Sequence, residues 1–159
     1  LPAYPKSHFE QGVNLYLCSL RLAHQPLLAG VKHLNRLENV LGRSEWTDPG
    51  IADGVLLDNN DLVIECTMSN IFARYGNQVL TPRLDLCGVS GVTRERLISQ
   101  LPFLNLMVSE EALPLSQLMQ ADEIFICNSL FGVWQVNQFN GKSWAKQTLA
   151  DKLNLQLIK

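Results

Sequence analysis

The chain has 159 residues, of which 47% are hydrophobic and 18% charged, and its formal net charge is -2. These values are typical of one globular domain that buries a core without disulfides or a structural metal. A charge near neutrality without a basic cluster argues against nucleic acid as a main partner. No apolar run is long enough to cross a bilayer and no signal peptide is visible, so we expect a cytoplasmic protein with no membrane partner.

The cysteines and histidines give no sign of a disulfide framework or a metal site. The cysteines form no C-x-x-C pair and lie mostly within apolar runs, as reduced cytosolic thiols do. The histidines have no metal-ligand spacing. The residues concerned are Cys18, Cys66, Cys87, Cys127, His8, His24 and His33.

The chain begins at Leu1 rather than Met, and residues 1–5 include two prolines that favour an extended connector. We therefore expect residues 1–10 to be a connector from a preceding N-terminal domain. Residues 11–159 would form one domain, the C-terminal part of a longer protein.

The first predicted elements are a strand and a helix. Residues 13–18 alternate apolar and other side chains, which predicts a strand that leads to a loop at residues 24–26. A helix is expected after Lys32. Its apolar side chains recur at helical spacing and should form one buried stripe. This stripe consists of Leu34, Leu37, Val40 and Leu41.

Two hairpins are predicted next, which indicates antiparallel sheet. Residues 54–57 and 62–67 flank the polar turn 58–61, and residues 71–74 and 78–80 flank Gly76 and Asn77.

The remaining elements alternate between helix and strand. We expect a helix that opens at residues 88–94 and ends before Pro102, a strand at 104–108 and a short helix that starts at 109–111. Strands at 122–129 and 133–136, a turn at 140–141 and a helical tail at 144–155 complete the chain. This pattern predicts an α/β domain with a curved, mixed sheet.

Four places in the sequence carry candidate chemistry. Lys32 is the only lysine between Ser7 and Gly141, and a desolvated lysine can act as a Schiff-base nucleophile, although a solvated surface lysine has the same pattern. Glu65 interrupts an apolar strand, so it either points to solvent or is buried against a cation.

The other two places are the start of an expected helix and the end of an expected strand. The run from Gly91 to Arg94 opens a helix whose free N–H groups suit an anion, with a Ser90-capped helix without ligand as the alternative. Asn128 and Ser129 end an apolar strand, where they either line a site or simply start a turn.

Several of these residues belong to a pattern that resembles the 4-amino-4-deoxychorismate lyases. These are pyridoxal-phosphate enzymes related to the branched-chain and D-amino-acid aminotransferases. The resemblance rests on the segment from Ala29 to Glu38, on Glu65 followed by Asn70, Ile71 and Phe72, and on the overall likeness up to about Val136. One departure is Cys66 with Thr67, where the aminotransferases have a glycine-containing sequence.

The resemblance implies a fold, a cofactor and a set of site residues. The sheet would be barrel-like and flanked by helices. Lys32 would be the catalytic lysine, and the cofactor, pyridoxal 5'-phosphate, would be bound by Lys32, Glu65, Val92, Thr93 and Ser129. Asn128 and Tyr4 are weaker candidates for contact with the substrate, and no metal is implied.

The expected reaction converts 4-amino-4-deoxychorismate to 4-aminobenzoate and pyruvate in folate biosynthesis, in a homodimeric full-length protein. One alternative is an aminotransferase of the branched-chain or D-amino-acid class. The other is a catalytically incomplete fragment that folds but does not hold the cofactor. There is no dinucleotide fingerprint, P-loop or nucleophile elbow in the sequence.

Overall fold

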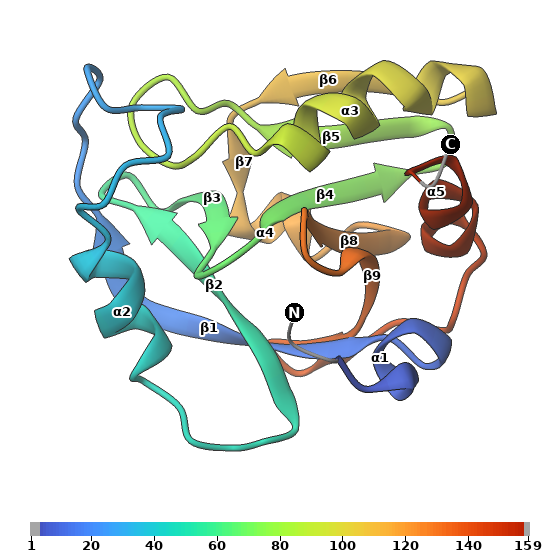
Figure 1. Cartoon of the computed structure of the whole chain (residues 1–159), viewed down its shortest axis with the longest axis horizontal. Helices are drawn as coiled ribbons and strands as arrows, with labels where there is room; N and C mark the ends of the chain where they lie inside the picture. Colours follow the sequence, from blue (N-terminus) through green and yellow to red (C-terminus); the bar gives the residue numbers. More distant parts are fainter. Residues whose placement is uncertain (1–3, 158–159) are drawn as a thin grey trace.

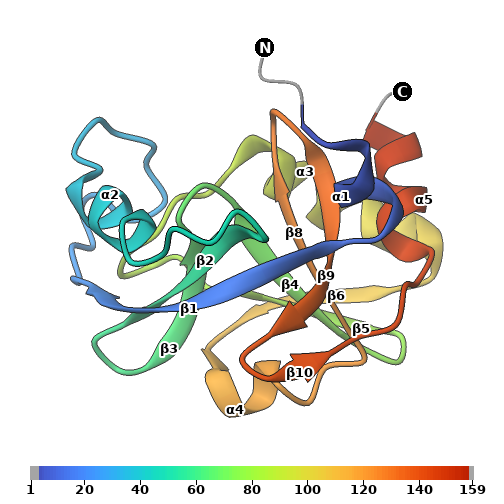
Figure 2. The ribbon, with the colours of Figure 1, turned by 90° about the horizontal axis from the view of Figure 1, so that it is seen from below.

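A computed structural model of the chain describes residues 4–157. A strongly curved mixed sheet nearly closes into a barrel, and helices lie around its outside (Figures 1 and 2). Along the sheet the strands follow the order β6-β5-β4-β8-β9-β1-β2-β3-β7, and β10 pairs with β9. The structure confirms the predicted α/β class with a barrel-like sheet.

The strands of the described residues are β1 (Val13–Leu22), β2 (Ile51–Asp58), β3 (Leu62–Cys66), β4 (Asn70–Tyr75), β5 (Gln78–Pro82), β6 (Met107–Glu111), β7 (Leu113–Pro114), β8 (Glu123–Asn128), β9 (Gly132–Phe139) and β10 (Lys142–Ser143). The helices are α1 (Lys6–Glu10), α2 (Leu37–Arg43), α3 (Val92–Gln100), the 3-10 helix η1 (Leu101–Leu104), α4 (Leu115–Leu118) and α5 (Leu149–Leu157). None of the helices in residues 4–157 is long and apolar enough to cross a membrane.

Both predicted hairpins are present. β2 pairs antiparallel with β3, with Leu56 opposite Glu65, and β4 pairs antiparallel with β5, with Ala73 opposite Leu80. β1 is parallel to both β2 and β9, which makes the sheet mixed.

The described residues form three apolar clusters, and the sheet separates two of them; the third, which includes Trp46, Leu56 and Ile64, lies next to α2. Successive side chains of a strand point to opposite faces. Ile71 of β4 therefore packs inside the barrel, whereas Phe72 packs outside against Phe125, with ring centroids 5.0 Å apart. Helices α3 and α5 cover this outer core with Leu97 and Leu153.

The predicted burial of the α2 stripe is wrong. Helix α2 begins at Leu37, and Leu34, Leu37, Val40 and Leu41 are all exposed, with Leu34 fully so. The helix packs on the sheet through the opposite face, where a Cβ on Gly42 would lie 2.9 Å from Leu56 Cδ2. Only a small residue lets the helix lie this close to Leu56 on the sheet. The larger apolar side chains lie on the other, exposed face of the helix.

Two predictions elsewhere need correction. Residues 109–111 do not start a helix but belong to β6, because they pair in parallel with β5; helix α4 follows later. The C-terminal helix begins at Leu149, and Trp144 is instead buried with its indole N–H donating to the Ala121 carbonyl at 2.9 Å.

Residues 6–10 of the expected connector form α1, which contacts β9 through rings such as His8 on Trp134. That residues 1–10 connect to a preceding domain stays a prediction.

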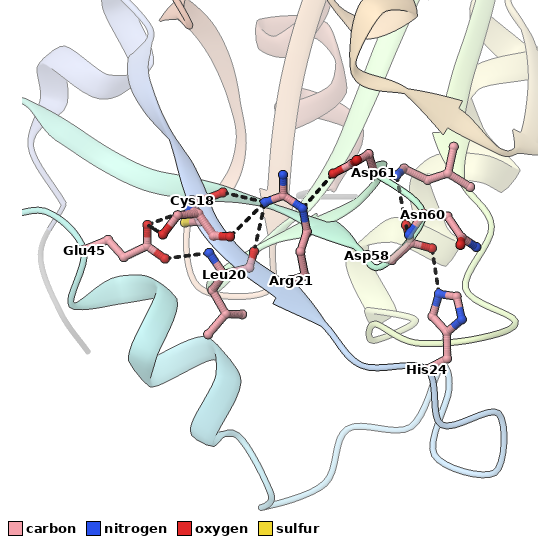
Figure 3. Close-up of polar contacts among 10 residues, drawn as sticks. Cys18, Leu20, Arg21, His24, Glu45, Asp58, Asn60 and Asp61 are labelled. Carbon is pink, nitrogen blue, oxygen red and sulfur yellow. Dashed lines mark hydrogen bonds and ion pairs between the residues drawn. The ribbon is translucent and has the colours of Figure 1, made fainter.

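The C-terminal end of β1 is irregular and is held by side chains (Figure 3). Its register with β2 shifts between Leu17 and Arg21. The Glu45 carboxylate accepts the N–H groups of Ser19 and Leu20 at 2.6 and 2.9 Å. Arg21 donates to the Cys18 carbonyl at 3.1 Å and pairs with Asp61 at 2.8 Å. These contacts fix the point where the chain leaves the sheet toward Lys32.

Candidate active site

One cavity of about 520 Å³ brings together the candidate residues from distant parts of the sequence. We call it the Lys32 cavity. It lies beside the end of β3, the turn to β4, the start of α3 and the end of β8. Every predicted site residue except Tyr4 lines it, namely Lys32, Glu65, Val92, Thr93, Asn128 and Ser129.

Tyr4 lies elsewhere. Its ring packs edge-on against Phe131 and Trp134, with centroid distances of 5.6 and 5.0 Å. Tyr4 is not among the residues that line the Lys32 cavity. Its contact with a substrate stays a prediction.

Glu65 is buried against a cation rather than pointing to solvent. Its side chain is 3% exposed. One carboxylate oxygen accepts the Val89 N–H at 2.8 Å, and the other lies 3.2 Å from both Arg36 Nη2 and Asn39 Nδ2. Burial raises the pKa of Glu65, and the Arg36 cation, the Val89 N–H and Asn39 oppose this rise. The carboxylate is thus held in one orientation at the wall of the cavity.

Asn70 connects Glu65 to the start of α3, a role that the sequence analysis did not assign. Its side-chain N–H donates to the Val89 carbonyl at 2.8 Å, and its side-chain oxygen accepts the Gly91 N–H at 3.2 Å. A Cβ on Gly91 would lie 2.4 Å from this oxygen, so only glycine fits there. The sequence feature that could have indicated this role is a polar amide side chain directly before the apolar residues Ile71 and Phe72.

The start of α3 can bind an anion. Gly91 is the N-cap and has no side chain to satisfy the free N–H groups of the first turn. The alternative of a Ser90 cap is wrong, because the Ser90 hydroxyl lies 2.5 Å from Glu95 Oε1 instead. The hydroxyls of Thr93 and Ser129 are 3.1 Å apart and face the same space. Two hydroxyls and a helix N-terminus form a neutral, donor-rich site.

The next residue of α3 anchors this arrangement. The Arg94 side chain is almost completely buried, donates to the Pro82 carbonyl at 2.9 Å and pairs with Glu110 at 2.6 Å. These contacts tie the first turn of α3 to strands β5 and β6, so Thr93 is held by the sheet.

Asn128 combines both alternatives that the sequence left open. Its side-chain oxygen accepts the N–H groups of Leu130 and Phe131 at 2.9 and 3.0 Å, which makes it a turn residue. Its side-chain N–H donates to the Met68 carbonyl at 3.1 Å, and it also lines the Lys32 cavity.

Lys32 lies in the exposed segment between β1 and α2. Gly30 anchors this segment: its N–H donates to the Gly88 carbonyl at 2.9 Å, and its carbonyl accepts the Ser90 N–H at 3.0 Å. Within residues 4–157 the Lys32 ammonium group makes no hydrogen bond or ion pair with the protein. Gly30, which anchors the backbone near Lys32, pairs with Val89, and the Val89 N–H donates to Glu65.

The Lys32 cavity thus offers an amine, an oriented carboxylate and an anion-binding helix start. No group of three potential metal ligands occurs within the described residues. This set of groups suits a small molecule that carries an anionic group, a carbonyl and a basic nitrogen.

Comparison with known proteins identifies the family of this chain. The model of the family described as amino-transferase class IV matches residues 1–139. Aminodeoxychorismate lyase of Vibrio harveyi is 43% identical over 86% of this chain and 50% of its own length. The chain therefore spans about half the length of this curated relative.

Solved structures show the same relationship. The crystal structure of 4-amino-4-deoxychorismate lyase from Pseudomonas aeruginosa superposes with a TM-score of 0.94 and 44% identity, over 98% of this chain and 58% of that one. The branched-chain amino acid aminotransferase from Escherichia coli shares the fold, with a TM-score of 0.83 and 22% identity over 92% of this chain and 51% of that one. The chain belongs to the class IV aminotransferase family and is a homologue of the aminodeoxychorismate lyases.

Proposed function

We propose that this chain is the cofactor-binding part of an aminodeoxychorismate lyase, which converts 4-amino-4-deoxychorismate to 4-aminobenzoate and pyruvate in folate biosynthesis. The observation that carries the proposal is that Lys32, Glu65 and the pair Thr93 and Ser129 line one cavity. Identities of 43% and 44% to two proteins named as this lyase favour this reaction over transamination.

The residues of the Lys32 cavity fit pyridoxal 5'-phosphate. The phosphate would be held by the N–H groups of Val92 and Thr93 and by the hydroxyls of Thr93 and Ser129. Glu65 would hold the protonated ring nitrogen, because a buried carboxylate favours a cationic partner. The amine of Lys32 would bond to the aldehyde carbon. When bound, this cofactor supplies a ring that accepts the electron pair left by a departing proton.

The chain's own residues then have separate tasks. Lys32, displaced by the substrate amine, removes the proton from the carbon that bears this nitrogen and holds it at Nζ. Glu65 keeps its orientation through Val89 and Asn39. The electron pair of the broken C–H bond would complete the aromatic ring, and the C–O pair would leave with the enolpyruvyl oxygen. The enolpyruvate would then take a proton at carbon to become pyruvate, and aromatisation makes the elimination strongly downhill. Asn128 and Tyr4 remain proposed substrate contacts.

The assembly and location are also part of the proposal. Exposed apolar residues gather on both sides of Lys32, in residues 27–41, which we call the Lys32 segment. They are Leu27, Leu28, Val31, Leu34, Leu37, Val40 and Leu41. A surface of this kind is usually covered by protein. We propose that it is buried in a cytoplasmic homodimer of the full-length protein.

The proposed reaction is tested by adding 4-amino-4-deoxychorismate to the full-length protein and measuring 4-aminobenzoate by chromatography. We expect product at a rate that depends on added pyridoxal 5'-phosphate. Conversion of the bound cofactor to its amine form with D-alanine or leucine, without 4-aminobenzoate, would support the aminotransferase alternative. That alternative is motivated by the shared lysine, glutamate and Asn70 pattern.

The same assay on residues 1–159 alone tests the alternative that this chain is a catalytically incomplete fragment. Product formation by this chain alone would exclude that alternative. Activity of the full-length protein without activity of the chain would support it.

A further inference from the structure

A second buried carboxylate lies behind the Lys32 cavity and has no task in the proposed reaction. Asp53 of β2 is 0% exposed. Its carboxylate accepts the hydroxyls of Thr67 at 2.6 Å and Ser69 at 2.7 Å, and the Gly54 N–H at 2.8 Å. The Met68 N–H is a further donor. No lysine or arginine forms an ion pair with Asp53 within the described part of the chain.

Three partners of Asp53, namely Thr67, Met68 and Ser69, are consecutive residues of one turn. Residues 67–69 join β3 to β4, and all of them line the Lys32 cavity. Glu65 lies just before this turn and Asn70 just after it. The turn also receives Asn128, whose amide donates to the Met68 carbonyl at 3.1 Å. The turn therefore forms the part of the cavity wall that lies between Glu65 and Asn128.

Asp53 is itself held rigidly by the barrel. A Cβ on the adjacent Gly54 would lie 2.6 Å from the Trp46 ring, so the backbone at this point packs directly on that ring. The Gly54 carbonyl accepts the Thr67 N–H at 2.9 Å, which adds a backbone contact to the side-chain contacts. The strand thus gives Asp53 one position from which to hold the turn.

The chemistry of Asp53 suits this role. Burial raises its pKa, and the donors from Thr67, Ser69, Gly54 and Met68 oppose the rise. A buried carboxylate without a cation is tolerated only when its oxygens are well hydrogen-bonded. An amide of the same shape offers one acceptor oxygen and cannot accept all of these donors.

We propose that Asp53 is a positioning residue that fixes the turn 67–69, and through it the placement of Glu65 and Asn128 at the Lys32 cavity. The effect on cofactor binding rests on the proposed function, whereas the effect on the turn does not.

The test compares Asp53→Asn with Asp58→Asn. Asp58 lies at the other end of β2 and is equally buried, but its partners, the Asn60 and Leu62 N–H groups and the His24 ring, do not line the Lys32 cavity. Thermal unfolding measures the general loss of stability in each variant. Hydrogen exchange of the amides of residues 67–70, measured without cofactor, reports on the turn.

Each variant is measured at the same number of degrees below its own unfolding midpoint. Under these conditions we expect the protection of these amides to fall roughly tenfold more in Asp53→Asn than in Asp58→Asn. The affinity for pyridoxal 5'-phosphate, measured by titration of the full-length protein, should fall by about the same factor in Asp53→Asn only. Unchanged protection in Asp53→Asn, or an equal loss in both variants, would overturn the proposal.

A second pair of variants applies if Asp53→Asn does not fold. Thr67→Val removes the hydroxyl but keeps the shape, whereas Thr67→Ser keeps the hydroxyl that donates to Asp53. We expect Thr67→Val to reduce the protection of Met68 and Ser69, and Thr67→Ser to restore it. Equal protection in the two Thr67 variants would contradict the role of Asp53.

The two proposals can fail separately. If the full-length wild type does not bind pyridoxal 5'-phosphate, the proposed function is wrong, and the cofactor-free exchange experiment still decides the role of Asp53. If the wild type binds the cofactor but the turn is unaffected in Asp53→Asn, only the positioning role is wrong.

Discussion

The two sides of the Lys32 cavity are built in opposite ways. On one side Glu65, Asn70 and Thr93 are buried and hydrogen-bonded to residues that the sheet positions. On the other side the Lys32 segment carries a row of exposed apolar side chains, and it contacts the barrel through Gly30, Arg36 and Asn39. The groups proposed to hold the phosphate and the ring nitrogen are therefore preorganised by this domain. Lys32 instead lies among exposed apolar side chains, the surface that we propose is buried in a homodimer.

The largest effect is expected on the lysine side. Lys32→Ala should remove the absorbance band of the bound cofactor and all lyase activity in the full-length protein, because Lys32 is the one lysine of residues 4–157 that lines the cavity. Absorption spectra and product assays measure this, with Lys6→Ala, whose side chain is 87% exposed, as the control. A band of normal intensity in Lys32→Ala would remove Lys32 from the mechanism.

The next effect concerns the carboxylate on the preorganised side. Glu65→Gln should leave cofactor affinity largely unchanged but slow proton removal roughly a hundredfold, because a neutral amide stabilises developing charge less well. Stopped-flow absorbance with the substrate gives this rate. Equal rates in the variant and the wild type would exclude Glu65 from the reaction.

The hydroxyls on the same side should have a smaller effect. Thr93→Val and Ser129→Ala should each weaken cofactor binding by about tenfold, because each removes a hydrogen bond to a charged group. Titration of the cofactor measures the affinity, and Ser99→Ala, on the exposed part of α3, is the control. Pyridoxal without phosphate should bind the variants and the wild type equally; a matching loss for pyridoxal would argue against phosphate contact.

The pH dependence of proton removal on the acid side tests whether Arg36, from one side of the cavity, acts on Glu65 on the other. Arg36, from the segment that leads into α2, opposes the rise that burial causes in the pKa of Glu65. In Arg36→Gln the pKa of Glu65 should rise further, so the carboxylate is protonated at a higher pH. The rate of proton removal should then begin to fall at a higher pH than in the wild type. The control Arg96→Gln should leave this pH unchanged. The same pH in Arg36→Gln and the wild type would show that Arg36 does not act on Glu65.

The smallest effect is expected at the exposed stripe. Leu34→Ser should change the free energy of unfolding of this chain by less than about 0.5 kcal/mol, because Leu34 is fully exposed. Gly42→Val, on the packed face of the same helix region, should cost about 2 kcal/mol through overlap with Leu56. Denaturant unfolding measures both values, and a large loss in Leu34→Ser would show that the stripe is packed in this domain.

The sequence predicted the parts of the fold that depend on local signals. Turn residues between apolar runs identified both hairpins, and the charge within an apolar strand identified Glu65. Helical spacing showed that α2 has an apolar face, but spacing does not say what covers that face. The strand at residues 109–111 depends on pairing with β5, which the local sequence Ser109–Glu110–Glu111 does not encode.

The candidate site was predicted where a residue carries its own chemistry. Lys32 and Glu65 are such residues. Asn70 and Asp53 were missed as site residues because their roles depend on partners distant in sequence, such as Gly91 and Ser69. Only the folded chain brings these groups together.

The most direct test of the account is to find which lysine reacts with the cofactor. The chain is mixed with pyridoxal 5'-phosphate, reduced with borohydride and digested, and the labelled peptide is identified by mass spectrometry. We predict selective labelling of Lys32, and competition by inorganic phosphate. Labelling spread over the other lysines, in this chain and in the full-length protein alike, would contradict the assignment of the Lys32 cavity as the cofactor site.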